Sequence, residues 1–109
     1  MKEIVDTLYR NRVILRDLEQ INLREELNSR KRIDIYLGKN FQNSSVVVVS
    51  ISKKSRVLQK EVKEIMDLIS KLEFNREIQI KRRYIYLKAP ICSKADSILK
   101  GRKWKFLNL

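Results

Sequence analysis

The chain has 109 residues, with 25 Lys and Arg against 13 Asp and Glu, which gives a net charge of +12 and a pI near 10.1. It has no histidine, one cysteine and two glycines, which excludes His-based acid–base catalysis, an internal disulfide, a multi-thiolate metal site and a glycine-rich phosphate loop. An apolar fraction of 43% supports one packed core, which predicts a single domain over residues 1–109. The sequence shows no bilayer-spanning apolar run and no signal-peptide pattern, so we expect a cytoplasmic protein without membrane contact.

The first half of the sequence predicts a helix followed by two strands. Apolar residues near helical spacing predict one helix over residues 3–28, with an optional break at Asn11. Residues 32–37 alternate with period two, which is typical of a strand with one buried face. Residues 46–51 are almost entirely β-branched, which predicts a central strand covered on both faces. Residues 38–44 between them have the composition of a hairpin loop.

The second half begins with the clearest helical pattern in the chain. An apolar stripe predicts a helix over residues 56–73, with Ser55 as its N-cap. Two strand segments follow at residues 77–80 and 84–89, and Pro90 ends the second of them.

The C-terminal residues predict a short helix over residues 93–100, with a capping-box-like start at Ser93 and a stop at Gly101. A final strand is predicted over residues 104–107. The resulting order, α-β-β-α-β-(α)-β, predicts an α/β or α+β domain in which two main helices cover a small mixed sheet. If the strands on either side of the long helix pair in parallel, their crossover should be right-handed.

Positive charge is concentrated outside the two long predicted helices. Residues 1–27 carry a net charge of −1 and residues 56–75 carry 0, whereas residues 28–55 carry +5 and residues 76–109 carry +8. A basic composition unrelated to function would load the helices as well. We therefore predict a contiguous cationic stripe along the sheet rim that binds nucleic acid by releasing counterions. The predicted phosphate contacts are Arg30, Lys31, Arg32, Lys53, Lys54, Arg82, Arg83, Arg102, Lys103 and Lys105.

Aromatic residues lie beside these basic residues in the sequence. Tyr84 and Tyr86 alternate with apolar residues and therefore share one face of a strand. If they are exposed, they and Trp104 could stack on unpaired bases. The alternative is that this face lies beneath a helix and that the tyrosines belong to the core.

The order of these segments resembles the PD-(D/E)XK, or restriction-endonuclease-like, nuclease superfamily over roughly residues 15–107. In that family a strand Asp and a Glu-x-Lys on the next strand bind a divalent metal and position water. Asp34 stands where the resemblance implies the first carboxylate. The next strand reads Val47-Val48-Val49-Ser50-Ile51-Ser52 in place of the hydrophobic run and Glu-x-Lys. Because a neutral hydroxyl cannot replace the charge of a carboxylate, the resemblance implies an inactive relative that kept the binding surface, without a cofactor.

Two other functions remain open at this point. One is a Mg²⁺-dependent nuclease in which Asp34 acts with a migrated lysine, Lys53 or Lys54, and in which Glu25 or Glu26 supplies a further carboxylate. The other is a homodimeric adaptor or protein-interaction domain, whose charge serves solubility and steering.

Overall fold

The structure is a computed structural model that describes residues 2–108. Within those residues the elements, in chain order, are α1 (Lys2–Arg10), β1 (Arg16–Gln20), α2 (Leu23–Leu27), β2 (Asp34–Lys39), β3 (Ser45–Ser52), α3 (Gln59–Arg76), β4 (Ile80–Lys88), α4 (Ser93–Gly101) and β5 (Lys105–Leu107). None of these helices is long and apolar enough to cross a membrane.

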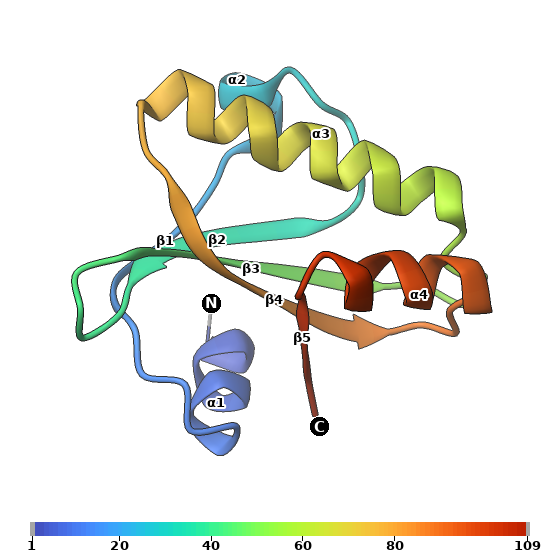
Figure 1. Cartoon of the computed structure of the whole chain (residues 1–109), viewed down its shortest axis with the longest axis horizontal. Coiled ribbons are helices and arrows are strands. Elements are labelled where there is room, and N and C mark those ends of the chain that lie inside the picture. Colours follow the sequence, from blue (N-terminus) through green and yellow to red (C-terminus); the bar gives the residue numbers. More distant parts are fainter. Residues whose placement is uncertain (1, 109) are drawn as a thin grey trace.

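The five strands form one mixed sheet in the order β1-β2-β3-β4-β5 (Figure 1). Neighbours among β1, β2 and β3 pair antiparallel, whereas β4 pairs in parallel with both β3 and β5. Parallel neighbours need a crossover connection, and α3 and α4 provide the two crossovers. The predicted α/β class with a mixed sheet is confirmed.

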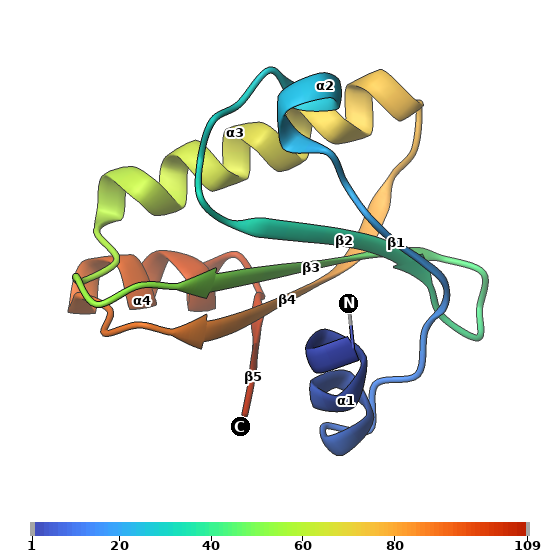
Figure 2. The same cartoon turned by 180° about the vertical axis from the view of Figure 1, so that it is seen from behind.

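Helices cover both faces of the sheet. α2, α3 and α4 lie over one face and α1 lies over the other (Figures 1 and 2). The four valines of β3, residues 46–49, are all fully buried, because successive side chains of a strand enter opposite faces. Val47 and Val49 join the core under α3 and α4, and Val48 joins the smaller core under α1. The prediction of a central strand with two covered faces is therefore confirmed.

The prediction of one helix over residues 3–28 is wrong, although the optional break at Asn11 is confirmed, since α1 ends at Arg10 and a turn follows. Only Lys2–Arg10 and Leu23–Leu27 are helical, and between them β1 forms an edge strand of the sheet. Ile4 and Leu8 of α1 pack on the α1-covered face, and the helix ends in a turn in which Arg12 has a φ of 59°.

A β-bulge explains why β1 resembles a helix in the sequence. Arg16 pairs with Lys39 and Glu19 pairs with Leu37, so β1 has one residue more than β2 between the two pairs. Asp17 lies in the bulge and accommodates it with a φ of 53°. The bulge places Leu15 and Leu18 against the same core although they are three residues apart, a spacing that otherwise indicates a helix.

The other strands are found with shifted ends. β2 begins two residues later than predicted and β3 extends one residue further at each end. Of the two strand segments predicted at residues 77–80 and 84–89, the first is strand only at Ile80, because Glu77 ends α3; one continuous strand, β4, runs from Ile80 to Lys88.

The long helix begins at Gln59, three residues later than predicted, and Ser55 does not cap it. Val57 lies in a short parallel bridge with Ile91 instead. Its N–H donates to the Pro90 carbonyl at 2.8 Å, and its carbonyl accepts from the Cys92 N–H at 3.1 Å. These tertiary hydrogen bonds hold residue 57 extended.

The ends of α4 also differ from the prediction. Cys92, not Ser93, is the N-cap, and its Sγ accepts a hydrogen bond from the Ala95 N–H at 3.4 Å. Gly101 belongs to the helix, and Lys103 adopts the left-handed conformation that ends the turn, with a φ of 64°.

Candidate nucleic-acid interface

Asp34 and Ser50 lie directly opposite each other on β2 and β3. They and Ser52 therefore share the sheet face that α1 covers in part. The Asp34 carboxylate accepts a hydrogen bond of 3.0 Å from the Gln20 amide, and Ser50 is half-buried. The positions at which the sequence resemblance implies a metal site thus come together, but with one carboxylate and two hydroxyls.

This arrangement does not fit a divalent metal. Hard cations such as Mg²⁺ are held by carboxylates and phosphates, and serine hydroxyls carry no charge to offset that of the ion. Among residues 2–108 there is no cluster of three or more His, Cys, Asp or Glu side chains that could hold a metal ion. The donor set at Asp34 therefore supports no metal-dependent step.

Two of the four residues expected to replace the missing groups, Lys53 and Glu26, are held elsewhere. Lys53 forms an ion pair with Glu61 of α3, on the sheet face opposite that of Asp34. Glu26 forms a bidentate pair with Arg76, at 2.6 and 2.8 Å, and the hydrogen bonds from this guanidinium lower the pKa of Glu26. Neither side chain is therefore brought to Asp34.

A different lysine lies beside the degenerate motif. Lys88 of β4 pairs in register with Ser52. Its ammonium forms an ion pair with Glu3 of α1 and lies 5.4 Å from the centre of the Tyr86 ring. Lys88 therefore anchors α1 to the sheet, a role that the sequence did not indicate because it depends on the register between β3 and β4.

The topology divides the predicted basic clusters into two groups at opposite ends of the sheet. β2 starts where β3 ends, which places residues 30–32 near residues 53–56, whereas the start of β4 lies beside the start of β3. The expected single stripe along the rim is therefore two separate surfaces. The β3-end group comprises Arg30, Lys31, Arg32, Lys53, Lys54 and Arg56. The β4–β5 edge group comprises Lys81, Arg82, Arg83, Arg102, Lys103 and Lys105.

The two groups differ in how far their charge is neutralised. In the β3-end group, Lys31 forms an ion pair with Glu64 at 2.9 Å, which lowers the pKa of that carboxyl, and Lys53 forms one with Glu61. In the β4–β5 edge group, no member has a carboxylate oxygen from residues 2–108 within 4.0 Å of its side-chain nitrogens. The edge group therefore carries the more concentrated uncompensated charge.

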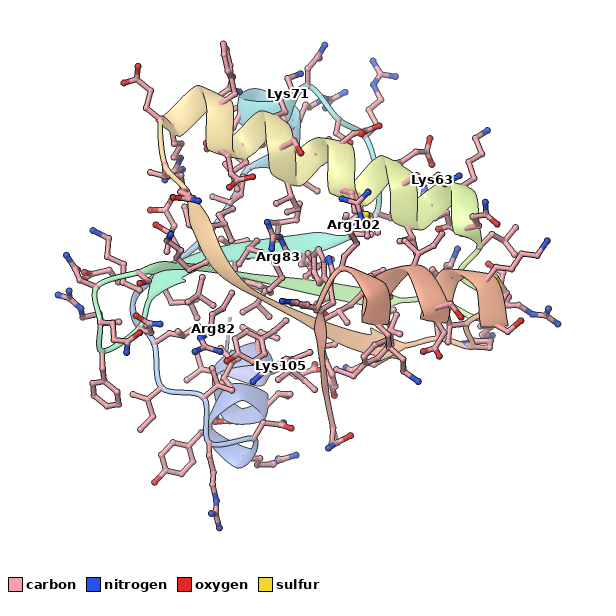
Figure 3. The ribbon with its side chains drawn as sticks, in the orientation of Figure 1. Lys63, Lys71, Arg82, Arg83, Arg102 and Lys105 are labelled. Atoms are coloured by element: carbon pink, nitrogen blue, oxygen red, sulfur yellow. The ribbon has the colours of Figure 1, made fainter. Side chains whose placement is uncertain are left out.

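The β4–β5 edge group projects on both sides of an open strand edge. β5 pairs only with Tyr84, Ile85 and Tyr86, so the outer side of residues 80–83 has no strand partner. Figure 3 shows Arg82 and Lys105 on the α1 side of β4, and Arg83 and Arg102 on the α3 side. All six residues are exposed except Arg83, which is half-buried. A polyanion that lies along this edge can reach cations on both sides of the strand.

The expected stacking role of the aromatic residues is not supported. Tyr86 is 3% exposed and Trp104 is 5% exposed, and each packs in one of the two cores. Tyr84 is half-buried on the same face as Tyr86. Tyr36 is also buried under α1, and this burial, followed by the charge of Asp34, raises the pKa of its hydroxyl. The core alternative is the correct one for Tyr86 and Trp104.

The exposed aromatic residues are ones that the sequence did not single out. Among residues 2–108, the large exposed aromatic side chains are those of Tyr9, Phe41 and Phe74. Phe41 lies in the β2–β3 hairpin loop, and Phe74 lies in the last turns of α3. These residues belong to no periodic apolar pattern, so the spacing of residues in the sequence could not have identified them.

Solved structures share the fold of this chain. No protein-family model and no curated protein matches its sequence. A repair endonuclease from Pyrococcus abyssi is 18% identical, with a TM-score of 0.56 over 99% of this chain and 46% of that chain. The apo form of EndoMS is 16% identical, with a TM-score of 0.56 over 99% of this chain and 45% of that chain. EndoMS in a complex with dsDNA is 14% identical, with a TM-score of 0.52 over 99% of this chain and 43% of that chain.

The likeness extends over the whole of this chain but less than half the length of these endonucleases. It shows that this chain shares the fold of these endonucleases, so the resemblance drawn from the sequence is confirmed at the level of the fold.

Proposed function

We propose that this protein is a non-catalytic nucleic-acid-binding domain that uses the β4–β5 edge group to contact the phosphate backbone of DNA. The observation that carries this proposal is the concentration, along one open strand edge, of six cations that have no carboxylate partner among residues 2–108. Such a surface gains affinity by releasing the counterions condensed on a nucleic acid. Double-stranded DNA is the chosen ligand because one structural neighbour was solved with dsDNA.

The degenerate metal site supports a binding role rather than a catalytic one. Ser50 faces Asp34 where a second carboxylate would be needed to hold a metal. The absence of that negative charge also reduces the repulsion between the protein and a phosphate backbone. Lys53, the expected substitute for the family's lysine, contacts Glu61 instead.

The proposal is tested with two variants that remove the same charge from opposite ends of the sheet. The edge variant replaces Arg82, Arg83, Arg102 and Lys105 by Ala, and the β3-end variant replaces Arg30, Arg32, Lys54 and Arg56 by Ala. Each lowers the net charge by four, and none of the eight side chains has an ion-pair partner within residues 2–108. We expect only the edge variant to lose most of its affinity for a DNA duplex in a gel shift.

Three results would count against the proposal. Equal losses in the two variants would mean that net charge, not the edge, determines binding. A wild-type protein that binds neither DNA nor RNA, single- or double-stranded, would favour the adaptor, which sedimentation would then test for a homodimer. Charged residues on an open strand edge also prevent edge-to-edge pairing between molecules. An edge variant that aggregates but keeps its affinity for DNA would support that purely structural role.

A further inference from the structure

Arg83 and Arg102 border a small recess between α3 and the β4–β5 edge. The recess has a volume of about 120 Å³. Figure 3 shows both arginines on the α3 side of β4, and they come from different elements, β4 and the segment after α4. The lining is completed by Met66, Ile69, Ser70, Glu73 and Trp104.

The charge of this recess is not balanced within the described chain. Arg83 is half-buried, and neither Arg83 nor Arg102 has a carboxylate from residues 2–108 within 4.0 Å. Buried or partly buried cations are normally paired, because burial removes part of their hydration. Glu73 also lines the recess, but its carboxylate lies more than 4.0 Å from both guanidinium groups and its Oε2 accepts a hydrogen bond of 2.8 Å from the Ile80 N–H, so two positive charges face one negative charge there. Two guanidinium groups therefore border one recess without a partner.

We infer that this recess binds a phosphate group of the nucleic acid, held by Arg83 and Arg102. This inference rests on the proposed function and adds the site at which one phosphate is fixed. Guanidinium groups bind phosphate oxygens through two parallel N–H···O bonds, a geometry that a lysine ammonium cannot reproduce. The Ser70 hydroxyl at the recess can donate a further hydrogen bond. The phosphate is either an internal phosphodiester or the monophosphate at a strand end.

Trp104 provides a local signal for occupation of the recess. It is the only tryptophan in the chain, is 5% exposed and lines the recess. Its fluorescence therefore reports on the surroundings of the recess, while the anisotropy of a labelled duplex reports total binding. The probes are two DNA duplexes of the same sequence, one with 5′-phosphate ends and one with 5′-hydroxyl ends.

The test variant is Arg83→Lys with Arg102→Lys, and the control is Arg30→Lys with Arg56→Lys in the β3-end group. Both keep the net charge, so they alter hydrogen-bond geometry without weakening the overall attraction. We expect the test variant to lose about tenfold in affinity, as for the loss of a charge-assisted hydrogen bond, and to lose the Trp104 response. The control should keep both. Glu73→Gln should bind more tightly than the wild type, because a negative charge is removed beside the phosphate.

The outcomes separate this inference from the proposed function. A Trp104 response with both duplexes supports an internal phosphodiester, and a response with the 5′-phosphorylated duplex alone supports a terminal phosphate. If the wild-type protein binds DNA by anisotropy but Trp104 does not respond, or if the test variant binds as tightly as the control, the recess is not a phosphate site. If the wild type shows no anisotropy change, the proposed function itself fails.

Discussion

Asp34 and Ser50 are direct partners in the antiparallel pairing of β2 and β3, so their side chains lie next to each other on one face. The resemblance drawn from the sequence implies that this pair of positions would supply two carboxylates in an active nuclease. Here one is a carboxylate bonded to Gln20 and the other is a neutral hydroxyl. The strand register therefore brings the two positions together, but only one of them carries a charge that could hold a metal.

Restoring the missing charge should restore metal binding. We expect Ser50→Glu with Ser52→Lys to bind Mn²⁺ and the wild type not to bind it, because two adjacent carboxylates offer the oxygen ligands that such cations need. Calorimetric titration with Mn²⁺ measures the difference, and a DNA cleavage assay in Mg²⁺ or Mn²⁺ tests for activity.

Asp34→Ala in the restored background is the control and should abolish the gained binding. Mn²⁺-dependent cleavage by the wild-type protein that disappears with Asp34→Ala would instead support the nuclease alternative and contradict the non-catalytic assignment.

Tyr86 should contribute to stability and not to DNA affinity. It is buried in the core under α1, with Ile4, Leu8 and Val48 in the same cluster. Tyr86→Leu keeps most of the apolar volume but removes the aromatic ring. We expect it to lower the free energy of unfolding by about 1–3 kcal/mol, measured by urea denaturation, and to leave DNA affinity unchanged. A clear loss of affinity in a variant that stays folded would mean that the ring reaches the nucleic acid.

The ion pair between Glu26 and Arg76 should make stability depend on acid pH. The hydrogen bonds that Arg76 donates to Glu26 hold the pKa of Glu26 below its ordinary value of about 4.5. The same bonds, together with the one that Arg76 donates to Glu19, raise the pKa of Arg76. A carboxyl whose pKa is lower in the folded state stabilises the protein above its unfolded pKa. That stabilisation is lost as the pH falls below about 4.5 and through the lower folded pKa.

Glu26→Gln should therefore lower the free energy of unfolding at pH 7 by about 1 kcal/mol. The free energy of unfolding of the variant should also fall less than that of the wild type as the pH is lowered from about 5 to below the folded pKa of Glu26. Urea denaturation over this pH range measures both effects. Asp67→Asn, on the exposed side of α3 and without an ion pair within residues 2–108, is the control and should change neither. A variant that matches the wild type at pH 7 and in acid would show that the pair adds nothing to stability.

Local sequence patterns predicted the elements whose packing follows those patterns. The valine run became β3 and the apolar stripe became most of α3. The prediction for the N-terminal region was wrong because the bulge at Asp17 gives an edge strand the apolar spacing of a helix. The ends of α3 and α4 were misplaced where tertiary contacts decided the backbone, as in the bridge of Val57 with Ile91.

The candidate site was predictable only in its residue types. The basic residues were identified from composition, but whether they form one surface depends on strand register, which local sequence does not encode. That register places Arg82 beside Val46 at one end of the sheet and Ser52 beside Lys88 at the other. Likewise, the neutralisation of Lys31 and Lys53 by α3 depends on where the helix lies on the sheet.

The salt dependence of DNA binding should distinguish the two basic groups most sharply. Each phosphate neutralised on a B-DNA duplex contributes about −0.9 to the slope of log K against log salt concentration. If all six edge cations contact phosphates, the edge accounts for a slope of about −5. The four-residue edge variant should then have a slope that is less steep by about 3 to 4 units.

The β3-end variant has the same net charge as the edge variant, but the four cations that it lacks lie far from the bound phosphates. It should therefore keep most of the wild-type slope. Anisotropy titrations at several salt concentrations measure both slopes. A slope that falls equally in the two variants would assign the binding to diffuse attraction by the whole surface. A slope that falls only in the β3-end variant would move the interface to the end of β3, beside Asp34 and Ser50.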